Sequence, residues 1–407
     1  AINRIKQLAN KNLIVDAVEL PSNHHSKDSL VNHIEEVLQT FDDDMNFAVN
    51  TLFKEMFEDG LIYRGGRIVN WDPKMQTTVA DDELEYTEAK GKFYYFQYGP
   101  VVIGTARPET KFLDKVIVVH PKDKRYKKLI GKEFEFEWID GKVKAKVIAD
   151  ECIDMKLGTG AMTITPAHSL IDFELAQKYD LRVEQIIDLN GHIRKDVSKS
   201  CGGLPIKEAR VRVLEILEKK GLLVKVDENY IHNISTNYRG KGIIEPQVMK
   251  QWFVDVNKKV INWKGKKRSL KEVMQDVVKS KMIRTLPDRF EKVYFHWINN
   301  LRDWCISRQI WWGHQIPVWY NKAHPEGIFS FEKPKGDYTR DPDTLDTWFS
   351  SGLWTFATLG WPKKTADFEY FHPTSVLETG YDIQFFWVAR MILASTYALR
   401  KSGLSEE

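Results

Sequence analysis

The sequence predicts an α/β protein in which a β-rich, mixed α/β unit is inserted between two segments of different character. Apolar residues repeat at helical spacing over residues 28–60 and alternate with polar residues over much of 93–148. After residue 246 the chain becomes rich in tryptophan and mixes helices with short apolar strands. Because 407 residues exceed one ordinary hydrophobic core, we expect three parts with the bounds 1–87, 88–240 and 241–407.

The first part predicts two helices and one short strand. Apolar residues at positions 30, 31, 34 and 37 share one helical face, and those at 47, 49, 52, 53 and 56 share another. Gly60 is a suitable end for the second helix, and residues 68–71 form an apolar run typical of a strand.

The inserted unit has its clearest local pattern at residues 133–148. Phe134, Phe136 and Trp138 alternate with glutamates, Asp140-Gly141 supplies a tight turn, and the returning strand alternates with lysines. A β-hairpin with opposite charges on its solvent face is therefore expected. Further strands at 93–98, 101–103 and 116–119 and helices at about 169–179 and 206–220 complete this unit.

The composition is typical of a globular cytoplasmic protein. The formal net charge is +3, so any nucleic-acid site depends on where basic residues cluster, as at 122–128 and 264–271, although solvated faces are the plainer interpretation. The three cysteines show no CxxC spacing, which favours neither zinc nor a disulfide framework and suits a reducing cytoplasm. No apolar signal segment opens the chain, and residues 383–399 contain Gln384 and Arg390, which favours a buried helix over a membrane span.

Two motifs in the inserted unit carry groups suited to hydrolysis. Residues 104–110 read Gly-Thr-Ala-Arg-Pro-Glu-Thr, and residues 158–168 read Gly-Thr-Gly-Ala-Met-Thr-Ile-Thr-Pro-Ala-His, with Asp172 four positions beyond His168. Arg107 could hold an anion, and a carboxylate could orient water while hydroxyl and backbone donors stabilise an oxyanion, without a metal. The alternative is structural: ordinary turns and a satisfied histidine.

Three strings in the last third resemble a known family. They are residues 303–320 (DWCISRQIWWGHQIPVWY), 346–354 (DTWFSSGLW) and 379–391 (TGYDIQFFWVARM). Together they resemble the class I aminoacyl-tRNA synthetases for branched aliphatic amino acids, and the valyl group most closely. The resemblance covers about residues 42–400 and implies an editing domain inserted into a partial Rossmann-like core.

The resemblance also implies residue roles in aminoacylation. Trp348, Ile383 and Trp387 match the positions that line the slot for valine, and Gly380 and Asp382 match those that contact the adenylate. The implied partners are tRNA(Val), valine and ATP, with Mg²⁺ accompanying ATP in the complete enzyme.

An apolar slot rejects a near-isosteric hydroxyl amino acid only on the order of a hundredfold, and the valyl enzyme facing threonine is itself the standard example. The resemblance therefore implies a second site that hydrolyses Thr-tRNA(Val) without a cofactor. Its motif positions fall on two sets of residues, with Asp172 the first choice for the catalytic carboxylate. The catalytic set is Arg107, Thr110, Thr165, His168 and Asp172, and the pocket set is Thr105, Thr163 and Ser169.

The chain departs from the family pattern at several of these places. Ala106 stands for the second threonine of the first motif, Leu113 for a glycine, Thr163 for a lysine and Ser169 for an aspartate. Either the lost cation and anion compensate, or the site has decayed. Asp72 and Met75 replace cysteines that bind zinc in some relatives, so no zinc is expected.

Class I adenylate synthesis also uses HIGH-type and KMSKS-type motifs, and neither is found in the sequence. We therefore expect this chain alone not to activate valine. Three interpretations stay open: a synthetase fragment that keeps deacylase activity, one half of a split enzyme that needs its missing half, or a non-catalytic paralogue that binds tRNA or aminoacyl-tRNA.

Overall fold

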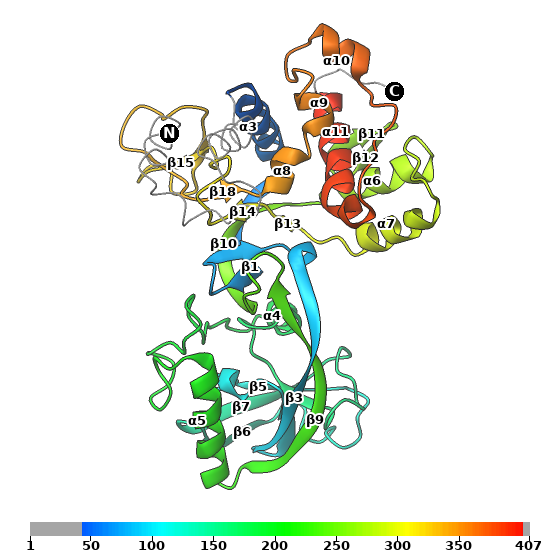
Figure 1. Cartoon of the computed structure of the whole chain (residues 1–407). Helices are drawn as coiled ribbons and strands as arrows, with labels where there is room; N and C mark the ends of the chain where they lie inside the picture. The colour runs from blue at the N-terminus through cyan, green and yellow to red at the C-terminus, as the bar shows by residue number, and fades with distance from the viewer. Residues whose placement is uncertain (1–42, 402–407) are drawn as a thin grey trace, which may run out of the picture. The chain divides into compact units, whose positions relative to one another are not determined.

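The computed structural model describes residues 43–401. The described chain divides into two compact units: residues 64–253 with 307–309 form one, and residues 43–63, 254–306 and 310–401 form the other. Helices and several sheets occur together, which confirms the mixed α/β expectation (Figure 1). Within residues 43–401, no helix has the length and apolar character that crossing a membrane requires.

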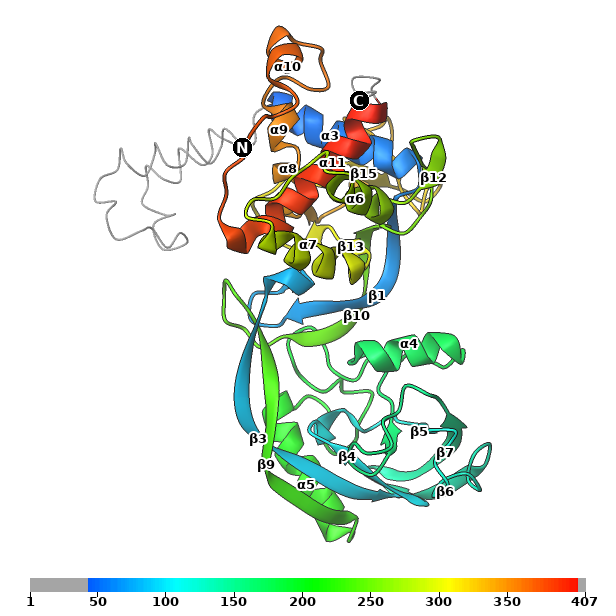
Figure 2. The same cartoon turned by 90° about the vertical axis from the view of Figure 1, so that its right-hand side faces the viewer.

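The 64–253 unit is organised around a long antiparallel ribbon. β3 (Leu84–Tyr98) pairs with β9 (Leu223–Asn237) from Leu84 opposite Asn237 to Phe96 opposite Leu223, and the two run side by side in both views (Figure 2). β4 (Val101–Thr105) pairs with the other edge of β3, which gives the order β4-β3-β9. The sequence pattern predicted the last part of β3 but not β9.

A second sheet of this unit contains the predicted hairpin. β6 (Glu133–Trp138) and β7 (Gly141–Ala149) pair antiparallel with Trp138 opposite Gly141, which confirms the hairpin and its turn. On its solvent face the Lys142 ammonium lies 3.4 Å from the Glu135 carboxylate. β5 (Val116–Val119) pairs parallel to β7, and β8 (Ala161–Thr163) pairs antiparallel to β5.

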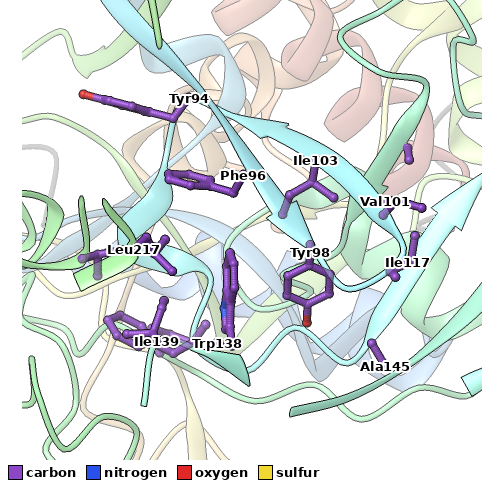
Figure 3. Close-up of a cluster of buried hydrophobic side chains, with 14 of the residues drawn as sticks. Tyr94, Phe96, Tyr98, Val101, Ile103, Ile117, Trp138, Ile139, Ala145 and Leu217 are labelled. Atoms are coloured by element: carbon purple, nitrogen blue, oxygen red, sulfur yellow. The ribbon is translucent and has the colours of Figure 1, made fainter. Parts of the chain in front are cut away.

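The core of this unit lies between these strands and α5 (Ile206–Lys219). The Tyr98 and Trp138 rings meet edge to face with centroids 4.7 Å apart, and Phe96 packs beside them (Figure 3). α5 adds Val213 and Leu217, both fully buried, to the same cluster. α4 (Leu170–Lys178) contributes Leu175 to a smaller cluster of buried residues.

The same unit holds a third group of strands and a tight turn. β1 (Ile62–Asp72) is longer than the predicted 68–71 strand and lies between β2 (Thr77–Val79) and β10 (Glu245–Val254). At the end of β1 the buried Asp72 carboxylate accepts hydrogen bonds from the backbone N–H groups of Lys74 (2.8 Å) and Met75 (3.1 Å) and from the Asn237 amide (2.9 Å).

In the described part of the chain, no cluster of three or more His, Cys, Asp or Glu residues could hold a metal ion.

The other unit is mainly helical where it is described. α3 (Asp43–Glu58) confirms the second helix expected in 28–60, whereas the first lies outside the described residues. Its described strands span two or three residues, so they do not form the long parallel sheet that a Rossmann-like core implies, and that core stays a prediction. The helices are α6 (Leu270–Lys279), α7 (Arg289–Asn299), α8 (Thr347–Ser351), α9 (Trp354–Ala357), α10 (Ala366–Phe371) and α11 (Ala389–Lys401). The strands of this unit are β11 (Ile261–Trp263), β12 (Lys266–Arg268), β13 (Trp304–Cys305), β15 (Val318–Tyr320), β16 (Ile328–Phe329), β17 (Thr339–Arg340) and β18 (Thr344–Leu345). The remaining strand, β14 (Ser307–Arg308), belongs to the 64–253 unit.

Candidate functional site

The first motif forms a turn that leads from β4 into a single 3₁₀ turn, η2 (Pro108–Thr110). The Thr105 hydroxyl oxygen accepts a hydrogen bond from the Arg107 backbone N–H at 3.0 Å, and the Thr110 hydroxyl donates to the Arg107 carbonyl at 2.9 Å. Both hydroxyl groups therefore shape the backbone around Arg107, and both are buried.

The Arg107 guanidinium is already occupied by carboxylates. Its Nη2 atom lies 2.6 and 2.8 Å from the two oxygens of Glu245, and its Nε atom lies 3.4 Å from Glu109. Glu109, fully buried, also forms a two-point pair with Arg210 at 2.9 Å. The structure thus makes Arg107 part of an internal chain of ion pairs. The sequence motif had suggested instead that the Arg107 guanidinium could hold an anion.

His168 is held at both ring nitrogens. Nδ1 lies 2.9 Å from the Pro246 carbonyl oxygen, and Nε2 lies 2.9 and 3.2 Å from the backbone nitrogens of Ile186 and Ile187. Since a backbone N–H can only donate, Nε2 must be the acceptor and Nδ1 must carry the proton. The neutral imidazole has no site left for proton transfer, which favours the structural interpretation of this histidine.

Asp172 lies in the first turn of α4, whose N-cap is Ser169. The Ser169 hydroxyl accepts from the Asp172 backbone N–H at 3.4 Å, and the Asp172 Oδ2 atom accepts from the Thr165 backbone N–H at 2.6 Å. Burial raises the pKa of this carboxyl and Asp114 adds to the rise, while Lys111 and the Thr165 N–H oppose it. A buried carboxylate with a raised pKa is the kind of group that serves as a general base.

Two residues that the sequence reasoning missed complete this polar network. The Lys111 Nζ atom lies 2.9 Å from Asp114 Oδ2, 2.9 Å from the Thr165 hydroxyl and 3.2 Å from the Thr163 carbonyl, and all four residues are buried. Position 163 carries a threonine where the family pattern has a lysine, and the Lys111 ammonium contacts the backbone carbonyl of that threonine. The spacing Lys111-x-x-Asp114, directly after the first motif, was a signal that could have shown this pair.

The network leaves one hydroxyl group available. The Thr163 side chain is 3% exposed, and its Oγ1 atom has no hydrogen-bond partner. A buried hydroxyl group without a partner costs free energy, so a polar ligand group at this point would be favoured. Leu113, at the position where glycine was expected, lines a hollow of about 400 Å³ together with Gln185, Arg194 and Val248.

The residues expected to bind valine lie in the other unit, where α8 meets the π-helical turn η4 (Gln384–Val388). Trp387 Nε1 donates to the Ser351 carbonyl at 2.9 Å, and the Trp348 ring stacks on Phe386 with centroids 5.4 Å apart. The structure therefore brings Trp348 and Trp387 to one junction, and single π-helical turns are frequent at functional sites.

The residues just before η4 belong to a second 3₁₀ turn, η3 (Tyr381–Ile383), whose N-cap is Gly380. Ile383 is half-buried, and Gly380 and Asp382 are exposed. A Cβ atom on Gly380 would lie 2.5 Å from Asp382 Oδ1, so glycine here gives the carboxylate its room. Three buried polar atoms at the junction have no hydrogen-bond partner: Trp348 Nε1, Ser351 Oγ and Gln384 Oε1.

Comparison with known proteins agrees with the resemblance carried by the sequence motifs. An α/β chain with these three tryptophan-containing strings is a protein of the class I aminoacyl-tRNA synthetase type. The chain belongs to the family described as tRNA synthetases class I (I, L, M and V), whose sequence model matches residues 32–333 and 321–403.

Within this family, the chain is similar to valine--tRNA ligases. The chain is 45% identical over 376 residues to the valine--tRNA ligase of Clostridium tetani, covering 89% of this chain and 41% of that protein. It is 44% identical over 371 residues to the valine--tRNA ligase of Clostridium acetobutylicum, covering 88% and 40%. The chain thus spans about two fifths of the length of these relatives. A solved LeuRS-tRNA-LeuAMS complex from Agrobacterium radiobacter has 14% identity to this chain and a TM-score of 0.35, over 98% of this chain and 56% of that one.

Proposed function

We propose that the 64–253 unit contains an editing domain at about residues 88–240, which hydrolyses the ester of Thr-tRNA(Val). The observation that carries this proposal is the buried network of Lys111, Asp114, Thr165 and Asp172, beside a Thr163 hydroxyl that has no partner. The Asp172 carboxylate, the Lys111 ammonium and the Thr163 hydroxyl group lie within one small region. These groups suit ester hydrolysis without a metal ion.

The proposed reaction begins with water held by Asp172. The carboxylate takes one proton from the water, whose oxygen forms a bond to the ester carbonyl carbon. The Thr163 hydroxyl, which has no partner within the protein, stabilises the oxyanion. The bond between carbon and the ribose oxygen then breaks, the ribose oxygen takes up the proton from Asp172, and threonine leaves as a carboxylate after losing its acid proton to solvent.

The remaining residues of the predicted set support this site structurally. Arg107, His168 and Thr110 hold the two motif loops in place through the ion pairs and hydrogen bonds described above. Ser169 caps α4, and Thr105 shapes the turn before Arg107. Their substitution is therefore expected to act through folding and positioning.

The other unit is proposed to serve aminoacylation in a complete valine--tRNA ligase. Trp348, Ile383 and Trp387 would bind the valine side chain, and Gly380 and Asp382 would face the adenylate, with Asp382 accepting hydrogen bonds from ribose hydroxyls. The partners of that enzyme would be valine, tRNA(Val) and ATP as its Mg²⁺ complex, in the cytoplasm. Editing itself would need neither ATP nor a metal ion.

Deacylation of Thr-tRNA(Val) by the purified chain tests the editing proposal. The parent should release threonine faster than the uncatalysed reaction, and Asp172→Asn should lose this activity by about a hundredfold or more. Glu174→Gln is the matched control, because Glu174 lies on the same helix and is exposed. Equal rates for the parent and Asp172→Asn would overturn the assignment of Asp172.

A non-catalytic paralogue that binds tRNA or aminoacyl-tRNA is the second candidate. Ser169 favours it, because this side chain caps a helix and supplies no anion to hold a substrate ammonium. Binding of Thr-tRNA(Val) without any turnover by the parent chain would support it. If the chain is half of a split synthetase, it should instead co-purify with a second chain that carries the HIGH motif.

A further inference from the structure

Lys111 is a buried lysine with three oxygen partners. Its residue is 7% exposed, and its ammonium donates hydrogen bonds to the Thr165 hydroxyl and the Thr163 carbonyl and forms an ion pair with Asp114 Oδ2. A buried charge is costly to desolvate and is retained only with such partners. The backbone is fixed as well, because Trp138 Nε1 donates to the Lys111 carbonyl at 2.6 Å.

Thr165 connects this lysine to Asp172. The Thr165 hydroxyl accepts from Lys111 and donates to Asp114 Oδ1 at 2.9 Å, while its backbone N–H donates to Asp172 Oδ2 at 2.6 Å. Removing the ammonium would therefore take away one of the two hydrogen bonds that hold the Thr165 side chain, whose backbone N–H donates to Asp172.

The charges around Asp172 come from several elements. Lys111 and Asp114 face it from the segment after η2, and the Cys152 thiol interacts with it from the turn that follows β7. The Ser169 hydroxyl and the Thr165 N–H are its neutral hydrogen-bond partners. Among these groups Lys111 is the cation, so it alone opposes the mutual repulsion of the two carboxylates.

We propose that Lys111 is the positioning residue of the editing site: it neutralises Asp114 and holds Thr165, so that Asp172 stays ionised and able to accept a proton from water. This inference rests on the proposed deacylase function. Without the cation, two buried carboxylates would share one site, and one of them would hold a proton until higher pH.

The test compares Lys111→Gln and Lys111→Arg with the parent in pH profiles of Thr-tRNA(Val) deacylation. For Lys111→Gln, which can still hydrogen-bond, kcat should fall at least about tenfold. Its acid limb should move to higher pH by about one unit or more. Lys111→Arg keeps the charge, so its acid limb should stay near that of the parent while kcat falls. Lys115→Gln is the control, because its side chain is 62% exposed and lies 3.9 Å from Glu184.

A second measurement separates this inference from the deacylase proposal. The pKa of the Asp172 carboxyl, followed by ¹³C NMR, should be higher in Lys111→Gln than in the parent and unchanged in Lys115→Gln. An inactive parent with this pKa difference would sink the deacylase proposal and leave the electrostatic role of Lys111 standing. An unchanged Asp172 pKa, or an unchanged acid limb in an active Lys111→Gln, would overturn the role of Lys111.

Discussion

Arg107 and Glu245 form a two-point ion pair, in which Arg107 Nη2 lies 2.6 Å from one carboxylate oxygen and 2.8 Å from the other. The pair joins the turn after β4 to the start of β10, far apart in the sequence. Glu245 also lies 3.3 Å from His168 Nδ1, so both predicted motifs depend on it. The hydroxyl-rich loops are thus organised from a residue outside either motif.

Glu245→Gln should lower the free energy of unfolding by about 3 kcal/mol, the lower end for a broken buried pair, because the Arg107 side chain is one-third exposed. The reason is that the Arg107 charge would lose its main partner. Urea denaturation followed by circular dichroism measures this loss. Glu85→Gln is the control: its pair with Lys241 is exposed on both sides, so at most about 1 kcal/mol should be lost.

The same pair should make stability depend on pH. Arg107 is the largest of the causes that hold the pKa of Glu245 below its usual value, against the opposing effect of burial. A lowered pKa in the folded state means that the contribution is fully present above the ordinary glutamate pKa and is lost as pH falls towards the lowered one. The stability difference between parent and Glu245→Gln should therefore be constant near neutral pH and shrink in acid. A difference that grows in acid would contradict this sign.

His168 is predicted to act through structure. His168→Phe removes the acceptor for the Ile186 and Ile187 N–H groups, so about 2–3 kcal/mol of stability should be lost. His168→Gln can restore an acceptor and should lose less. The deacylation pH profile of His168→Gln should keep the shape of the parent profile. Selective loss of a limb near the pKa of an ordinary histidine, in a folded variant, would instead show a proton-transfer role.

Sequence patterns predicted the fold where local signals agreed. The hairpin of β6 and β7 has strict alternation and an Asp140-Gly141 turn, so its register follows from local chemistry. β9 was missed because its apolar residues do not alternate cleanly: Val224 and Ile231 are exposed, and pairing with β3 determines the strand. Such long-range pairing leaves little trace in a single segment.

The sequence motifs named candidate site residues but not their partners. Thr165 and Asp172, both in the predicted catalytic set, lie in hydrogen-bond contact. Glu245 could not be selected from the sequence, because a glutamate in a charged chain is usually solvated and only the fold shows that it is buried. The ion pairs of Arg107 were hidden for the same reason.

Asp72 is predicted to stabilise the end of β1 without a metal. Its carboxylate accepts two backbone N–H groups and the Asn237 amide, so Asp72→Ala should lose about 2–3 kcal/mol of stability. Treatment of the parent with a chelator should leave its Tm unchanged. A Tm that falls with the chelator and recovers with added zinc would contradict this prediction.

Trp138 is predicted to connect the core to the candidate site. Its ring is 1% exposed, and its Nε1 donates to the Lys111 carbonyl. Trp138→Phe leaves a void and an unpaired carbonyl, so about 2–4 kcal/mol of stability should be lost. Val213→Ala is the control, because it also creates a void in this core but leaves Lys111 untouched. At temperatures where both variants remain folded, deacylation kcat should fall several-fold further in Trp138→Phe, because the backbone that carries the ammonium is then no longer fixed. Equal kcat values in the two variants would contradict the prediction that Trp138 affects the candidate site through the Lys111 carbonyl.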